Sequence, residues 1–316
     1  MISTLASVTG GAATPETTDG TPANAACAWC GATLDPSAEH PAGRVPCTTC
    51  GSQTTWPPPT DAELDRAYGS WYRPGSGRFS GLGDQLLSRL RGRLAGRLDE
   101  IAPPGRVLDV GSGDGSLLDA LAARGRPATG LERESARPDV IAGELADLEP
   151  PYAGVVLWHS LEHLRDAGTE LGRAVELLGP GGAIVVAMPN PASLQARAFG
   201  DRWLHLDLPL HLVHVPAPAL LDRLGALGAR VERVSYLRGG QVVFGWLHGI
   251  VGLLPGHPDL YDAIRRPEAR RRSLSTGRRL ATVAAGALAL VPAVACALVE
   301  AGLRRGGTVY VEARRG

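Results

Sequence analysis

The chain has 316 residues, of which 44% are hydrophobic, so it can hold one large α/β domain with appendages around a real core. Its 32 basic and 32 acidic residues cancel, which excludes a global electric field that would recruit nucleic acid or an acidic partner. All 32 basic residues are arginines, which together with abundant alanine, glycine and proline indicates a base-composition bias rather than a function.

The first 25 residues are small and polar, with no basic segment followed by a continuous apolar run. This composition argues against a secretory signal, so we expect a cytoplasmic protein. Low apolarity combined with Gly, Thr, Pro and Ala predicts a disordered leader over residues 1–25.

Four of the five cysteines come next, in two C-x2-C pairs separated by sixteen residues: Cys27, Cys30, Cys47 and Cys50. This spacing suits one tetrahedral Zn²⁺ and predicts a zinc ribbon over residues 26–55. Four thiolates leave no open coordination position, so the predicted role is structural. Two disulfides or four free thiols are the competing interpretations.

Residues 56–80 begin with a proline-rich linker, and Thr60 with Glu63 fits a capping box that opens a short helix. The end of this helix carries Tyr68, Trp71 and Tyr72. These aromatic side chains predict either a lid over a ligand or packing between domains.

The segment 81–240 shows the pattern of a doubly wound α/β domain. A leucine-rich helical spacing over 81–101 predicts an amphipathic helix that covers one sheet face. Strands are expected at 106–110, 127–132, 154–158 and 182–188, helices at 115–124 and 167–178, and a short strand or loop near 140–145. Such alternation predicts a mostly parallel sheet with helices on both faces and ligands at the carboxyl ends of the strands.

The first strand of this domain, 107–110, runs into alternating glycines at positions 111, 113 and 115. Glycines there allow positive φ and a close approach of the backbone, and the following helix points its N-terminal amides at the ligand. Glu132 ends the next strand 21 positions after Gly111, about where an acid meets ribose hydroxyls. A nucleoside-bearing cofactor is therefore expected, although Ser116 fits a dinucleotide fingerprint less well.

The C-terminal third contains twenty uncharged residues, 280–299, a length that could cross a bilayer. Arginines flank both ends, so charge does not orient a crossing, and a single crossing would separate the expected last strand, 307–316, from the sheet. A second uncharged run, 241–254, is too short to span. We therefore expect an apolar helical insertion over 241–306 that either contacts the inner face of the membrane or packs as a subdomain or dimer surface.

Several motifs together resemble the class I S-adenosylmethionine-dependent methyltransferases, from about residue 80 to the C-terminus. The segments that carry the resemblance are Val107-Leu108-Asp109-Val110-Gly111-Ser112-Gly113-Asp114-Gly115, Glu132, Leu157-Trp158-His159-Ser160-Leu161-Glu162-His163-Leu164, Met188-Pro189-Asn190-Pro191 and the stretch 200–211. The last of these is similar to bacterial members that accompany sugar and cell-envelope pathways. The resemblance implies a Rossmann-like seven-stranded sheet, mostly parallel, with an antiparallel last strand.

The resemblance also implies the cofactor S-adenosyl-L-methionine and the residues that hold it. They are Asp109, Gly111, Ser112, Gly113, Gly115, Glu132, Leu145 and His159. The chain departs from the family at Tyr152-Ala153-Gly154, where an acidic residue is common, and only Glu144 or Asp147 loosely matches the family's acid near the third strand.

Methyl transfer to a hydroxyl or a carbon acid requires a base, and histidine suits that role near neutral pH. The candidates are His159, His163, His205 and His211, with His214 in the same segment as the last two. Each of these histidines could instead have a structural role. The spacing His205-x5-His211-x2-His214 could also indicate a metal site.

The predicted function is methyl transfer to a small molecule, a sugar or a lipid-linked glycan. A ribosomal RNA methyltransferase is one alternative, weakened by the zero net charge. A non-catalytic zinc-ribbon interaction protein on a degenerate methyltransferase fold is another, opposed by the intact glycines, Glu132 and His159.

Overall fold

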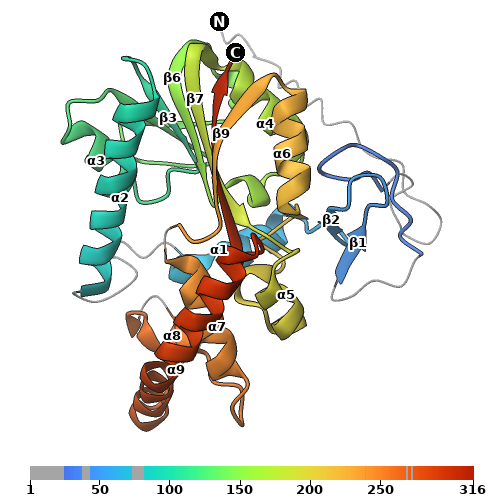
Figure 1. The fold of residues 1–316 in the computed structure, drawn as a ribbon, viewed down its shortest axis with the longest axis vertical. Coiled ribbons are helices and arrows are strands. Elements are labelled where there is room, and N and C mark those ends of the chain that lie inside the picture. The colour runs from blue at the N-terminus through green and yellow to red at the C-terminus, as the bar shows by residue number, and fades with distance from the viewer. Residues whose placement is uncertain (1–24, 38–42, 73–81, 239, 268–269, 272) are drawn as a thin grey trace, which may run out of the picture.

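The computed structural model describes residues 25–37, 43–72, 82–238, 240–267, 270–271 and 273–316. The leader predicted for 1–25 lies outside these residues except at its last position, and so do residues 73–80 of the predicted linker. Figure 1 shows a twisted central sheet with helices on both faces, a small β-unit to one side, and a group of helices that extends beyond one end of the sheet.

The central sheet has seven strands in the order β5-β4-β3-β6-β7-β10-β9. Strands β3 to β7 run parallel, and β10 runs antiparallel to both of its neighbours. The bounds of the seven strands are β3 Val107–Val110, β4 Ala128–Glu132, β5 Val140–Ala142, β6 Tyr152–Trp158, β7 Leu178–Pro189, β9 Ala229–Ser235 and β10 Thr308–Arg315. The predicted fold class, including the antiparallel last strand, is confirmed.

Alternate residues of the central strands enter two separate cores. Val155 and Leu157 of β6 pack under helices α4 (Ala167–Glu176) and α6 (Ala217–Ala226), whereas Val156 packs under α2 (Leu82–Ile101) and α3 (Ser116–Ala122). The period of two along a strand therefore separates the layers of helices seen on the two faces in Figure 1.

The helix predicted over 81–101 matches α2, but only its second half covers the sheet. Leu94 and Leu98 are buried, whereas Leu86 and Leu87 are 57% and 40% exposed. The apolar spacing alone did not distinguish these two halves, because burial depends on where the sheet ends beneath the helix.

The cysteine segment forms part of a three-stranded sheet in the order β1-β2-β8. Here β1 is Arg44–Pro46, β2 is Gln53–Thr55 and β8 is Val213–His214, far along the chain. Cys27, Trp29 and Val45 belong to the same buried cluster as the α4 and α6 face of the main sheet. The ribbon is thus joined to the central domain by backbone pairing and by a continuous core.

The remaining described elements link these units. They are α1 Asp61–Tyr72, η2 Leu145–Asp147, η3 Leu161–His163, α5 Leu194–Phe199, η4 Gly200–Arg202, η5 Leu204–Leu206, α7 Gln241–Gly252, α8 Leu260–Ile264 and α9 Thr276–Gly302. The last three lie together below the sheet in Figure 1 and lead directly into β10. Helix α9 is long and apolar enough to cross a membrane by length and composition, and 28% of its most apolar window is buried.

Candidate functional site

The turn after β3 adopts the backbone that its glycines predict. Gly111, Gly113 and Gly115 have φ values of 74°, 60° and 73°, all in the left-handed region. A Cβ at Gly111 would come within 2.6 Å of the Ser160 Cβ, so the turn packs tightly against the segment after β6. A Cβ at Gly113 would meet nothing within 4 Å, so this part of the turn faces open space. The turn therefore offers a ligand a cradle of backbone rather than side chains.

Two carboxyl groups lie beside this turn. Glu132, at the end of β4, is 7% exposed, and its Oε1 accepts a hydrogen bond from the Gly113 backbone N–H. Asp109 on β3 is buried, and burial, together with the nearby charges of Glu132 and Asp114, raises its pKa to about 7. The predicted cofactor residues Asp109, Gly111, Ser112, Gly113, Gly115 and Glu132 thus come together at the carboxyl ends of β3 and β4.

The same region carries a buried polar group without a partner. Ser112 Oγ is buried and makes no hydrogen bond among the described residues. It packs against Gly130, where a Cβ would lie only 2.5 Å from that oxygen. Leu145, another of the predicted contacts, is 2% exposed at the start of η2, beyond β5. Open space, backbone donors and a carboxylate at one strand end fit the ribose and amino-acid parts of S-adenosylmethionine.

His159 directly follows β6 and has a φ of 54°, an uncommon conformation for a residue with a side chain. Its Nδ1 lies 3.1 Å from Oε1 of Glu162, which is 1% exposed. Burial would raise the pKa of this carboxyl group, but the hydrogen bond and charge of His159 and the neighbouring rings lower it to about 2. The backbone of His159 is therefore strained at the end of β6. The buried, ionised carboxylate of Glu162 orients the His159 imidazole.

The other predicted histidines surround this pair. The His205 ring stacks on His159 at 6.4 Å, and His211 Nδ1 lies 2.8 Å from the His205 carbonyl oxygen. The rings of His163 and His211 are 4.8 Å apart. Burial lowers the pKa of His163 to about 4 and that of His205 to about 3, so both are neutral and weakly basic at neutral pH.

Helix α1 adds a side chain to this cluster. The Tyr68 hydroxyl lies 3.1 Å from His163 Nδ1, which also faces the Leu210 carbonyl oxygen at 2.9 Å. Of the three aromatic residues predicted to form a lid or a packing contact, Tyr68 therefore reaches the site. The side chains of Trp71 and Tyr72 lie outside the described residues.

The metal alternative based on His205, His211 and His214 does not correspond to a cluster of ligand atoms. In the described part of the chain, a different group with histidines brings its ligand atoms within 4.8 Å of one another. This group consists of Glu162, His163 and His211. His214 instead places Nε2 3.2 Å from the Thr55 hydroxyl. Glu162 Oε2 is buried without a hydrogen-bond partner among the described residues, so this set has a carboxylate oxygen to offer a cation.

The four predicted thiol ligands converge. All four Sγ atoms lie within 4.8 Å of one another, with 3.7 Å between Cys27 and Cys50 and 3.6 Å between Cys30 and Cys47. A tetrahedron with Zn–S bonds of about 2.3 Å has edges of about 3.8 Å, so the arrangement fits Zn²⁺. In each pair the residue after the second cysteine is a glycine with a φ of 74° that donates its N–H to the carbonyl of the first cysteine.

Thr55 connects the ribbon to the histidine cluster. This residue ends β2, and its hydroxyl donates to the His211 carbonyl oxygen at 2.6 Å. With its only proton used there, the hydroxyl accepts from His214 Nε2, which fixes the tautomer of that ring. No local pattern marks Thr55 as a site residue, because its partners lie more than 150 residues away along the chain.

Comparison with known proteins matches residues 83–234 to a family described as "Methyltransferase domain". The chain is 29% identical over 174 residues to a ubiquinone biosynthesis O-methyltransferase of Alkalilimnicola ehrlichii, covering 47% of this chain and 67% of that protein. It is 31% identical over 178 residues to a probable S-adenosylmethionine-dependent methyltransferase of Mycolicibacterium smegmatis, covering 50% and 66%.

A solved structure of a SAM-dependent methyltransferase from Archaeoglobus fulgidus aligns with 18% identity and a TM-score of 0.41, over 71% of this chain and 94% of that one. The family match covers α2 to β9, and therefore includes the glycine turn, Glu132 and all five histidines of the cluster.

Proposed function

We propose that this chain is a class I S-adenosylmethionine-dependent methyltransferase and that it methylates a hydroxyl group of a small-molecule, sugar or lipid-linked glycan acceptor. The observation that carries the proposal is the pair His159–Glu162 at the end of β6, beside the glycine turn at the end of β3. The O-methyltransferase among the relatives supports oxygen as the methylated atom.

In this proposal some site residues bind the cofactor and others act on the acceptor. The backbone of Gly111 to Gly115 and the carboxylate of Glu132 hold the cofactor, which supplies an electrophilic methyl group on a sulfonium when bound. The chain must then align the acceptor oxygen with that methyl group and remove its proton.

His159 is the proposed base. With its Nδ1–H directed at Glu162, Nε2 is the basic nitrogen and accepts the acceptor's hydroxyl proton as the oxygen–methyl bond forms. The ionised Glu162 stabilises the resulting imidazolium. His163 and His205 are poorer bases near pH 7, because their lowered pKa values reduce their proton affinity.

Cofactor binding is tested first, by titration calorimetry with S-adenosylmethionine and its demethylated product. We expect Glu132→Ala and Gly113→Arg to weaken binding by about 10- to 100-fold, since each removes a contact or fills the cradle. Glu134→Ala, two residues away and exposed, is the matched control and should bind like the wild type. Failure of the folded wild-type protein to bind either ligand would contradict the proposal and favour a non-catalytic interaction protein.

The base is tested by transfer of labelled methyl groups from S-adenosylmethionine to a panel of phenols, sugars, lipid-linked glycans and ribosomal RNA. At saturating cofactor, His159→Ala should reduce turnover by about 10²- to 10⁴-fold. His257→Ala, at an exposed histidine, is the control. Equal turnover by His159→Ala and the wild type would remove His159 from the mechanism, and methylation of ribosomal RNA alone would favour the RNA alternative.

A further inference from the structure

Helix α9 presents a wide apolar face that the rest of the described chain does not cover. Its buried positions lie on one side, at Thr282, Gly286, Ala289, Ala293, Ala297 and Glu300. The other side exposes Leu280, Val283, Leu288, Leu290, Val291, Val294, Leu298 and Val299, with Leu288 at 83% and Val291 at 78%. No charged residue interrupts the helix from 280 to 299. We call these eight exposed residues the outer face of α9.

Both ends of α9 are held by the same globular body, so the helix does not cross a bilayer. Near its C-terminal end, buried Glu300 accepts hydrogen bonds from Gln195 Nε2 at 2.9 Å and Trp246 Nε1 at 2.7 Å. Just before its N-terminal end, Arg271 forms an ion pair with Asp207 of the domain, with 2.5 Å between Arg271 Nη2 and Asp207 Oδ1. A membrane in contact with the outer face would therefore lie along the length of α9, and α9 would not span it.

Arginines flank the outer face at both ends. Arg278 and Arg279 lie in the first turn of α9, where the helix dipole favours acidic side chains, and Arg304 and Arg305 follow its last turn. Within the part of the chain that the structure describes, none of the four forms an ion pair with a carboxylate. The apolar strip thus ends in positive charge on both sides.

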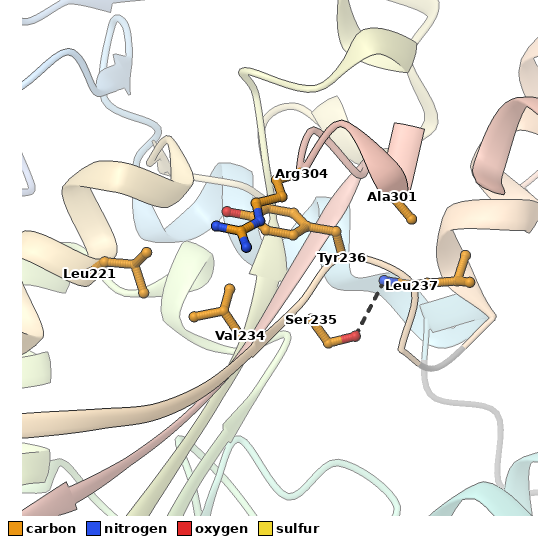
Figure 2. Close-up of a pocket in the computed structure, with 7 residues that line it drawn as sticks. All are labelled: Leu221, Val234, Ser235, Tyr236, Leu237, Ala301 and Arg304. Atoms are coloured by element: carbon orange, nitrogen blue, oxygen red, sulfur yellow. Dashed lines mark hydrogen bonds between the residues drawn. The ribbon is translucent and has the colours of Figure 1, made fainter. Parts of the chain in front are cut away.

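A pocket of about 520 Å³ lies at the C-terminal end of α9, where α6, β9 and α9 meet. Figure 2 shows the Arg304 side chain beside Tyr236, with Ala301 of α9 and Leu221 of α6 on opposite sides. The pocket combines four apolar side chains with Ser235, Tyr236 and one guanidinium group. That combination suits the phosphate and the upper acyl chain of a phospholipid.

We propose that the outer face of α9, its four flanking arginines and the Arg304 pocket form a peripheral surface that binds a bilayer of anionic phospholipids. This surface goes beyond the proposed methyl transfer and does not depend on it. A second copy of the chain fits less well. A two-fold antiparallel pairing of α9 would bring Arg278 and Arg279 of one copy against Arg304 and Arg305 of the other. Lipid phosphates complement both ends at once.

The test is co-sedimentation of the full chain with vesicles of phosphatidylglycerol and phosphatidylcholine, compared with phosphatidylcholine alone. We expect binding to the anionic vesicles to be at least about tenfold tighter and to weaken at high salt. Leu288→Glu/Val291→Glu and Arg278→Glu/Arg279→Glu should each weaken it by about tenfold or more. Arg304→Glu should weaken the preference for anionic lipid, whereas Ile141→Glu, on exposed β5, should have no effect.

Cofactor affinity of each variant is measured in parallel, so that loss of vesicle binding is separated from misfolding and from failure of the methyltransferase proposal. Wild-type protein that does not bind anionic vesicles would overturn the inference. So would a dimer, seen by light scattering without lipid, that Leu288→Glu/Val291→Glu dissociates. Unchanged binding by Arg304→Glu would remove the pocket from the surface.

Discussion

At the scale of single residues, the histidine cluster combines one ionised carboxylate with neutral imidazoles. Glu162 stays ionised because hydrogen bonding and charge outweigh its burial, whereas His163, His205 and His214 lose proton affinity because burial dominates. Burial therefore decides the charge state only where hydrogen bonds and neighbouring charges do not outweigh it. The sequence placed these histidines at strand ends but could not separate a base from its buried neighbours.

His214 allows a prediction about acid stability. Burial and the neighbouring charges of His211 and Arg44 lower its pKa to about 3, from 6.5 in an unfolded chain. Because the unfolded state then binds more protons, the free energy of unfolding is fully retained above pH 6.5 and falls as the pH drops toward 3. At pH 5.5 this one histidine should cost about 1.4 kcal/mol.

Urea denaturation of the wild type and His214→Gln at pH 7.5 and 5.5 measures this cost. The variant should lose less stability between the two pH values by about 1.4 kcal/mol, because glutamine does not titrate. Identical losses in both proteins would show that His214 is not the titrating group.

At the scale of elements, one glycine sets how closely the ribbon approaches α4. A Cβ at Gly168 would lie 1.8 Å from the Trp29 carbonyl oxygen, and the Gly168 N–H donates to the Ala28 carbonyl at 3.1 Å. The ribbon backbone therefore rests directly on the first turn of α4.

Gly168→Ala should destabilise the protein by about 1–3 kcal/mol, because the ribbon must shift away from the helix. Gly172→Ala is the matched control on the same helix, since its Cβ would meet only a Leu227 methyl at 3.5 Å. That change should be neutral or stabilising by about 0.5–1 kcal/mol. Thermal unfolding of the two variants distinguishes the contact from helix propensity, and equal shifts would contradict this account of the interface.

At the scale of the whole molecule, the ribbon and the candidate active site share strand pairing. Strand β2 pairs with β8, which carries His214, and Thr55 at the end of β2 bonds to the His211 carbonyl. Loss of metal from the four thiols should therefore disturb the structure of the histidine cluster as well as that of the ribbon.

Chelation of zinc should lower the melting temperature by about 5–10 °C and reduce methyl transfer, while addition of Zn²⁺ restores both. Metal analysis should find about one zinc per chain. Cys47→Ser should lose that zinc, whereas Cys296→Ser, on α9, should keep it. Full zinc content in Cys47→Ser would contradict the four-thiolate site.

Local patterns were enough to predict much of this protein. The alternation of strands and helices, the glycines at 111, 113 and 115, and the paired cysteines depend on backbone geometry over a few residues, and the structure has them as expected. The edge strand β9 was not located, because its sequence, Ala229–Ser235, is largely polar and only its first residue is buried.

The tertiary structure decided the rest. Three features depend on contacts between segments distant in sequence. The His205 ring stacks on His159, Thr55 and Tyr68 reach histidines about 100 residues away or more, and α9 keeps an uncovered apolar face. The spacing and hydropathy of residues predict the secondary structure and the apolar face of one segment by itself. Partners, burial and the resulting pKa values arise only when the chain has folded, because each is set by neighbours that local sequence does not specify.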